Sequence, residues 1–213
     1  ALKNLELEDN SLESPLKEIW PLGTEPVIEY LRTVYMGSKS RELDLSDMNL
    51  TTFPPEVADV QGLRILHLNK NTLIGMPGIL GNLTALTMLS AHSNRIASVP
   101  PEIGKLTSLT ELFLQNNQLM HLPDEVGDMH NLKHFALNNN KLKDMAPGLM
   151  RNTSLTVLQL AHNSLVEIPM WIWKLSKLTT LNVEDNPLQC PPEKILERGT
   201  KAVLAYMQLV DRS

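Results

Sequence analysis

The chain has 213 residues, 42% of them hydrophobic and 20% charged, a composition that suits a folded domain with a continuous core and argues against disorder. Its net charge of −5 gives no electrostatic basis for binding nucleic acid or anionic lipid, because both require clustered Lys and Arg. No apolar stretch reaches the roughly 18 residues that cross a bilayer, so no membrane insertion is predicted.

The first 39 residues contain a segment that occurs again near the C-terminus. Asp9–Leu31 reads DNSLESPLKEIWPLGTEPVIEYL, and Asp185–Met207 reads DNPLQCPPEKILERGTKAVLAYM. Both copies hold an Asp-Asn pair, a Gly-Thr pair and then an apolar run with helical spacing. We expect residues 1–24 to be either the last repeat of a preceding array or an N-terminal cap repeat. Residues 25–39 should form a cap-like helix and connector.

Residues 40–198 consist of seven blocks with a period of 23 residues. The first block begins at Ser40, and the others begin at Leu63, Leu86, Leu109, Leu132, Leu155 and Leu178. Most blocks follow the pattern LxxLxLxxNxLxxLPxxIxxLxx. Its LxLxx part alternates as a short strand does, so Leu112 and Leu114 should point inward while Glu111, Phe113 and Gln115 point outward. Because one block cannot bury its apolar face alone, the strands should stack in parallel.

An asparagine occupies the ninth position of six blocks, where the chain leaves the strand. Its amide can both accept and donate hydrogen bonds, so a buried ladder that joins neighbouring turns is expected. The ladder residues are Asn71, Asn94, Asn117, Asn140, Asn163 and Asn186. Met48 takes this position in the first block. In the fifth block the proline shifts to Pro147 and Asn152 replaces an outer apolar residue, so the repeat pattern does not define the local convex geometry there.

Residues 199–213 are predicted to form a C-terminal cap helix. Its apolar residues recur at helical spacing and should cover the open end of the core. They are Ala202, Val203, Tyr206, Leu209 and Val210.

The blocks resemble the leucine-rich repeat, in the 23-residue form of the plant intracellular Ras-group proteins and the Ras-suppressor scaffold proteins. The resemblance implies an α/β solenoid, a right-handed horseshoe with a parallel concave sheet, short helical or extended convex returns and a C-terminal cap helix. It also implies a non-enzymatic scaffold that binds another protein in small-GTPase or phosphatase signalling. The single cysteine, Cys190, cannot form an intrachain disulfide, which favours a reducing compartment and hence the cytoplasm.

No arrangement of residues in the sequence is typical of a catalytic, cofactor or metal site. Four histidines fall at outward positions of predicted strands, but they lie in different columns and blocks, which does not favour convergent metal ligation. They are His67, His92, His134 and His162. Cys190 has no neighbouring base that would activate its thiol. We therefore predict no enzyme activity, no metal and no cofactor.

The outward residues of stacked strands should form columns on one curved face. The middle of this face is apolar among His, Gln and Asn, and both ends are acidic, a pattern typical of protein-binding surfaces. The predicted contact residues are Ile65, His67, Met88, His92, Glu111, Phe113, His134, Val157 and Gln159. Two other functions stay open. The chain could be a structural subunit of a large assembly, or a fragment that serves as the recognition arm of a larger multidomain enzyme.

Overall fold

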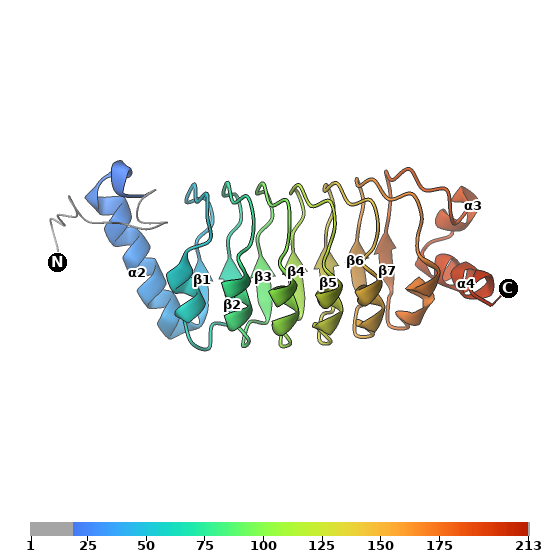
Figure 1. Cartoon of the computed structure of the whole chain (residues 1–213), viewed down its shortest axis with the longest axis horizontal. Coiled ribbons are helices and arrows are strands. Elements are labelled where there is room, and N and C mark those ends of the chain that lie inside the picture. Colours follow the sequence, from blue (N-terminus) through green and yellow to red (C-terminus); the bar gives the residue numbers. More distant parts are fainter. Residues whose placement is uncertain (1–18, 213) are drawn as a thin grey trace.

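The computed structural model describes residues 19–212, which form a stack of repeats between two helical ends (Figure 1). Helix α2 (Thr24–Ser40), preceded by the 3-10 turn η1 (Trp20–Leu22), lies at the first end. Helices α3 (Glu193–Leu196) and α4 (Thr200–Val210) lie at the other end. The prediction for residues 1–18, part of a preceding or capping repeat, lies outside the described residues.

Seven three-residue strands form one parallel sheet in sequence order. They are β1 (Glu42–Asp44), β2 (Ile65–His67), β3 (Met88–Ser90), β4 (Glu111–Phe113), β5 (His134–Ala136), β6 (Val157–Gln159) and β7 (Thr180–Asn182). The register follows the sequence period, since Glu42 pairs with Ile65 and Ile65 pairs with Met88. The predicted α/β solenoid with a parallel sheet is confirmed. The seven strands lie in a nearly straight row (Figure 1).

Short 3-10 helices return the chain on the opposite side of the core. They are η2 (Pro55–Asp59), η3 (Gly78–Asn82), η4 (Pro101–Lys105), η5 (Asp124–Asp128), η6 (Pro147–Arg151) and η7 (Met170–Lys174). In most blocks a proline directly precedes the first helical residue, as Pro100 and Pro123 do. Proline suits this place because its fixed φ fits the turn and its missing N–H is not needed there.

The fifth block has a return of the same kind in spite of its unusual sequence, which settles the geometry that the pattern left undefined. Its return is η6, five residues long like its neighbours, with Pro147 as the first helical residue. Asn152 is fully buried, and its Nδ2 donates to the carbonyl oxygen of Val126 at 2.9 Å. The polar side chain is therefore accommodated by a hydrogen bond to the preceding return, although its Oδ1 has no partner in the described part of the chain.

The alternation of inward and outward residues on the strands agrees with the prediction. Leu112 and Leu114 are fully buried, whereas Glu111, Phe113 and Gln115 are partly exposed. The core extends without interruption from the first repeat to the last, because each inward residue packs against its counterparts in the repeats on either side.

The asparagine side chains join consecutive turns through hydrogen bonds in both directions. For Asn117, Oδ1 accepts from the N–H of Ile96 at 3.0 Å, and Nδ2 donates to the carbonyl oxygens of Ala91 and Leu114 at 3.0 Å each. The same set recurs at Asn71, Asn94, Asn140, Asn163 and Asn186, which are all buried except the partly exposed Asn186. Each amide thus satisfies backbone groups of its own turn and of the preceding repeat.

A second ladder, of threonines, lies just before the strands and was not predicted. The Thr110 hydroxyl donates to the carbonyl oxygen of Thr87 at 2.9 Å, and the Thr179 hydroxyl donates to that of Thr156 at 3.0 Å. The backbone N–H of each threonine donates to the same oxygen. Four of the six strand junctions therefore have side-chain hydrogen bonds at both ends, whereas Arg64 and Lys133 take the threonine position at the other two.

Glycines on the convex side allow consecutive returns to approach closely. A Cβ atom added to Gly104 would lie 2.6 Å from the carbonyl oxygen of Glu125, and one added to Gly81 would lie 2.7 Å from that of Glu102. The approach is closest between η5 and η6, where a Cβ on Gly127 would overlap the carbonyl group of Gly148. A residue with a side chain cannot occupy this position without moving a return.

The two end helices begin in the same way, in keeping with their shared Gly-Thr sequence. The residue before α2 is Gly23, with φ 108° and ψ 176°, and the residue before α4 is Gly199, with φ 81° and ψ −178°. This backbone region is essentially restricted to glycine. The paired Thr24 and Thr200 then open the two helices.

Helix α2 covers the end of the core next to β1. Val27 and Tyr30 are buried, and Gly37 lies against Leu43 of β1. The Tyr30 hydroxyl donates to Oε1 of Glu56 at 2.5 Å. Burial first, and this hydrogen bond to a carboxylate second, raise the pKa of Tyr30 well above its usual range, so it stays a neutral donor.

Helix α4 covers the other end, but its buried face differs from the one predicted. Val203 and Met207 are buried, whereas Leu209, expected in the core, is 69% exposed. The apolar residues of this segment form a broad stripe, and contact with β7 and η7 decides which part of the stripe turns inward.

This orientation of α4 predicts a contrast between two substitutions on the same helix. Met207→Ala should lower the free energy of unfolding by about 2 kcal/mol, because it opens a cavity under the cap. Leu209→Ala should change it by less than about 0.5 kcal/mol, since this side chain is already in water. Urea denaturation followed by circular dichroism measures both, and an equal loss in the two variants would contradict the orientation.

Candidate functional site

The strand residues that point away from the core form columns across the sheet, and we call this surface the open face. In strand order the first column is Glu42, Ile65, Met88, Glu111, His134, Val157 and Thr180, and the second is Asp44, His67, Ser90, Phe113, Ala136, Gln159 and Asn182. The predicted contact residues lie in these two columns, apart from His92, which follows β3 in the next column.

Apolar side chains gather in the middle of the open face. Ile65, Met88, Phe113 and Val157 are all partly exposed. The ring of Phe113 meets that of His134 edge to face, with centroids 4.9 Å apart and planes at 75°. These five residues, which we call the central patch, form a surface of the kind that anchors a partner once both sides are desolvated.

Two buried polar atoms near Phe113 have no hydrogen-bond partner among residues 19–212. They are Oε1 of Gln115, on the same strand segment, and Nε2 of His134, on the next strand. By contrast, the Ser90 hydroxyl on the same face donates to Oδ1 of Asn69 at 2.6 Å. An unpaired buried polar atom costs about 1–3 kcal/mol, which a ligand group that reaches it can offset.

Gln115 was absent from the predicted contact residues. The sequence pattern marks it only as one of several outward polar side chains, and no signal in the sequence separates it from the others. Its distinction comes from the side-chain arrangement around Phe113, which a repeat pattern does not specify.

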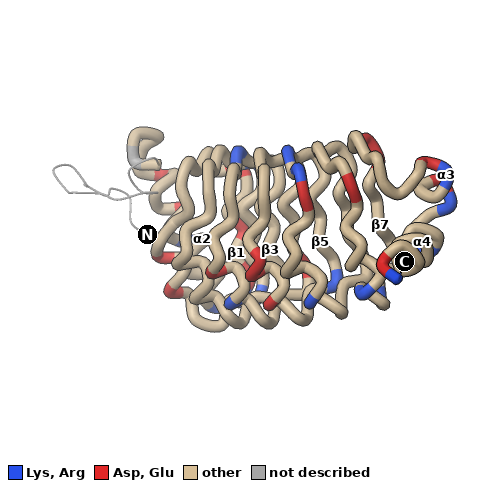
Figure 2. The backbone as a smooth tube through the Cα atoms, turned by 45° about the vertical axis from the view of Figure 1, so that its right-hand side comes forward, with Lys and Arg blue, Asp and Glu red and all other residues tan. Residues whose placement is uncertain are grey.

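Carboxylates occupy both ends of the open face. Glu42, Asp44 and Asp47 lie at the β1 end, and Glu184 and Asp185 follow β7. In Figure 2 red segments occur beside α2 and β1 and again between β5 and β7. The approach of a partner with basic groups at both ends of its contact surface is therefore favoured.

Local hydrogen bonds stabilise the ionised form of Asp44. Burial alone would raise the pKa of Asp44, but hydrogen bonds from the side chain and backbone of Ser46 outweigh it, and the proximity of His67 adds to them. The net pKa lies below the ordinary value, so Asp44 is ionised at neutral pH.

Two histidines of the open face lie near carboxylates. His67 Nε2 lies 3.9 Å from Oε1 of Glu42, and His162 Nδ1 lies 3.3 Å from Oδ2 of Asp185. Burial, and then the charges of Lys70 and His67, lower the pKa of His92, which is therefore neutral at pH 7. Within residues 19–212 no three His, Cys, Asp or Glu side chains are grouped so that they could hold a metal ion.

Comparison with known proteins identifies the repeats. The family model of the leucine-rich repeat matches residues 84–142 and 130–188. The chain thus contains the repeats of leucine-rich repeat proteins. Such proteins commonly mediate contacts between proteins, and the fold is typically a non-enzymatic interaction module. No curated protein matches this leucine-rich repeat chain. Over the described residues, no helix has the length and apolar character to span a membrane.

Solved structures of other leucine-rich repeat proteins are similar to this one. A leucine-rich repeat protein of Leptospira interrogans is 34% identical over 68% of this chain and 37% of its own, with a TM-score of 0.67. The plant peptide hormone receptor RGFR1, solved in complex with RGF2, is 27% identical over 64% of this chain and 23% of its own, with a TM-score of 0.59. An internalin of Listeria monocytogenes, 23% identical over 66% of this chain and 39% of its own with a TM-score of 0.59, supports the fold alone. Our leucine-rich repeat chain thus spans well under half the length of each.

Proposed function

We propose that this protein is a non-enzymatic scaffold that binds another protein through the open face, with Phe113 and Met88 as anchors. The observation that carries the proposal is the pair of unpaired buried atoms, Gln115 Oε1 and His134 Nε2, on either side of the partly exposed Phe113. An apolar anchor next to polar atoms that await a partner is the arrangement found at the centre of protein interfaces.

The ends of the open face define the rest of the contact. Adjacent strands are about 4.8 Å apart, so the carboxylates at β1 and those after β7 are separated by roughly 29 Å. A partner that presents an apolar centre with Lys or Arg on both flanks over this distance would match the face. The receptor similar to this chain was solved with RGF2 bound, which supports recognition of a protein or peptide by this fold.

The sequence resemblance adds a class of partner and a compartment to the proposal. Ras-group and Ras-suppressor proteins suggest a small GTPase or a phosphatase in a cytoplasmic signalling complex. The single Cys190, which is a free thiol, agrees with a reducing compartment.

The proposal is tested by affinity capture with matched variants. Met88→Glu combined with Phe113→Glu places two charges in the central patch and should reduce recovery of the specific partner by at least about tenfold. Ile74→Glu combined with Met120→Glu is the control, because these side chains are 67% and 44% exposed but lie outside the columns of the open face. Thermal denaturation would verify that both variants fold.

The results decide between the proposed surfaces. If a partner is lost only from the Met88→Glu, Phe113→Glu variant, binding through the open face is supported. If both variants retain the partner equally, binding through the open face is contradicted. Contacts through the convex side, as a subunit of a large assembly would make, are then favoured.

Gln115→Met should separate stability from binding. The substitution keeps the length of the side chain and removes the unpaired acceptor, so the free protein should gain about 1 kcal/mol in its free energy of unfolding. Binding to the captured partner should weaken, since the partner loses the atom that it would pair with. Urea denaturation and titration calorimetry measure the two effects, and a variant that is both less stable and unimpaired in binding would refute this role of Gln115.

A further inference from the structure

A second binding surface lies at the C-terminal edge of the sheet, apart from the open face. We propose that the edge of β7 takes an extended, basic segment of a partner protein as an additional strand. The proposal rests on the unpaired backbone of that edge, on the groove beside it and on the charge of the groove, and it does not depend on the function of the central patch.

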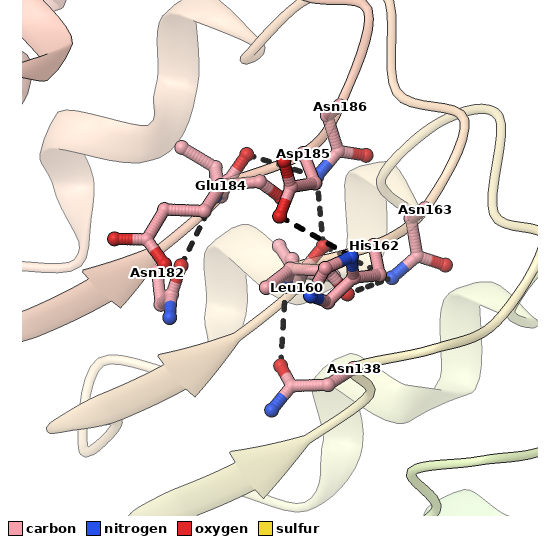
Figure 3. A network of polar contacts seen from close by, with 10 residues as sticks. Asn138, Leu160, His162, Asn163, Asn182, Glu184, Asp185 and Asn186 are labelled. Carbon is pink, nitrogen blue, oxygen red and sulfur yellow. Dashed lines mark hydrogen bonds and ion pairs between the residues drawn. The ribbon is translucent and has the colours of Figure 1, made fainter.

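The segments that contain β6 and β7 are joined by backbone hydrogen bonds that the outer edge of β7 lacks. One repeat earlier, the N–H of Leu160 donates to the carbonyl oxygen of Asn182 at 2.7 Å, and the N–H of His162 donates to that of Glu184 at 2.9 Å. Figure 3 shows the surroundings of these residues, with the contact between His162 and Asp185. The corresponding residues of the last repeat are Val183 and Asp185. Their N–H groups have no acceptor among the described residues.

The cap closes only part of this edge. The N–H of Leu181 donates to the hydroxyl of Thr200, the first residue of α4, at 2.9 Å. Beyond Leu181 no described residue takes the place of the missing neighbouring strand, although Val183 itself is only 9% exposed. A donor without an acceptor in so buried a residue favours the addition of a carbonyl group from outside.

A groove runs alongside the open part of the edge. It has a volume of about 590 Å³ and lies between β7 with its following turn and the segment from α3 to the start of α4. Its apolar surface comes from Val183, Leu188 and Leu196, which are buried or partly exposed. A strand added here would therefore have apolar contacts on one side as well as the backbone donors of Val183 and Asp185.

The polar lining of the groove has one sign of charge. Its carboxylates are Glu184, Asp185, Glu193 and Glu197, all exposed, and no Lys or Arg is among the lining residues. Lys194 and Arg198 are next in sequence to two of these carboxylates but do not line the groove. The charge selects a basic occupant over an acidic one.

These features define the chemistry of the occupant. The stretch from Leu181 to Asp185 matches an extended segment of about five residues, because each residue of a strand advances roughly 3.3 Å. Successive side chains of a strand point to opposite sides, so alternation of Lys or Arg with Val or Ile would place charges near the carboxylates and apolar groups near Val183.

The test uses the full chain and a terminally blocked peptide of sequence KVKVKVK. Binding should slow hydrogen exchange at the amides of Val183 and Asp185, measured by ¹H–¹⁵N NMR, by at least about tenfold. The peptide EVEVEVE should not bind. Glu193→Lys combined with Glu197→Lys should weaken binding by about tenfold at low salt.

A matched control places the same charge change elsewhere. Glu102→Lys combined with Glu125→Lys, on the convex returns, should leave peptide affinity within about twofold. The Met88→Glu, Phe113→Glu variant should also bind the peptide normally, which separates this proposal from the function of the open face. Absence of binding, binding without protection of the two amides, or an equal loss in the control variant would each overturn the proposal.

Discussion

Gly127→Ala should destabilise the protein by about 3 kcal/mol or more, because the new methyl group has no space. Its Cβ would overlap the backbone carbonyl of Gly148 on the next return. That return cannot simply move away, since Arg151 joins η6 to η5 through 2.8 Å and 2.9 Å hydrogen bonds to Asp128 and to the carbonyl oxygen of Asp124. Urea denaturation followed by circular dichroism should show a lower midpoint.

Gly75→Ala is the matched control for this prediction. No atom lies within 4 Å of the position where its Cβ would be, and its backbone is outside the left-handed region. The substitution should therefore be neutral or stabilise by up to about 1 kcal/mol, through the reduced entropy of the unfolded chain. If Gly127→Ala proved as mild as Gly75→Ala, the close contact between η5 and η6 would be refuted.

The second large effect is expected from Asn117→Leu. The substitution leaves the N–H of Ile96 without its acceptor and the carbonyl oxygens of Ala91 and Leu114 without a donor, all in a buried turn. Because each unpaired buried group costs about 1–3 kcal/mol and the turn can relax in part, a loss of about 3 kcal/mol is expected. The free energy of unfolding from urea titration measures it.

Gln118→Leu, one residue further along, provides the comparison for the ladder. Gln118 is exposed, so the same kind of change should alter stability by less than about 0.5 kcal/mol. Similar losses in the two variants would mean that the ladder does not depend on the amide of Asn117.

The sequence period was sufficient to predict which residues become equivalent. A spacing of 23 residues defines the strand register, and Glu42, Ile65 and Met88 are accordingly neighbours on one face. The period also marks the position of Asn117, because an amide at a fixed place in every turn can join that turn to the next. These features follow from local repetition, so no knowledge of distant contacts is needed.

Features that depend on contacts between different parts of the structure could not be predicted from the sequence. The unpaired atoms of Gln115 and His134 result from how neighbouring side chains fill the space around Phe113. The inward side of α4, with Met207 in place of Leu209, results from docking against β7 and η7. Neither the packing of one face nor the rotation of a helix is encoded in a pattern that treats every repeat alike.

The glycine contacts on the convex side also determine the shape that the open face presents. A stack bends when its outer elements are thicker than its strands, whereas thin 3-10 returns that touch through Gly81, Gly104 and Gly127 can keep nearly the spacing of the sheet. The row of strands is accordingly almost straight (Figure 1). A surface of such low curvature cannot enclose a narrow ligand from several sides. It favours a broad, flat partner, whose residues meet several repeats at once on either side of the central patch.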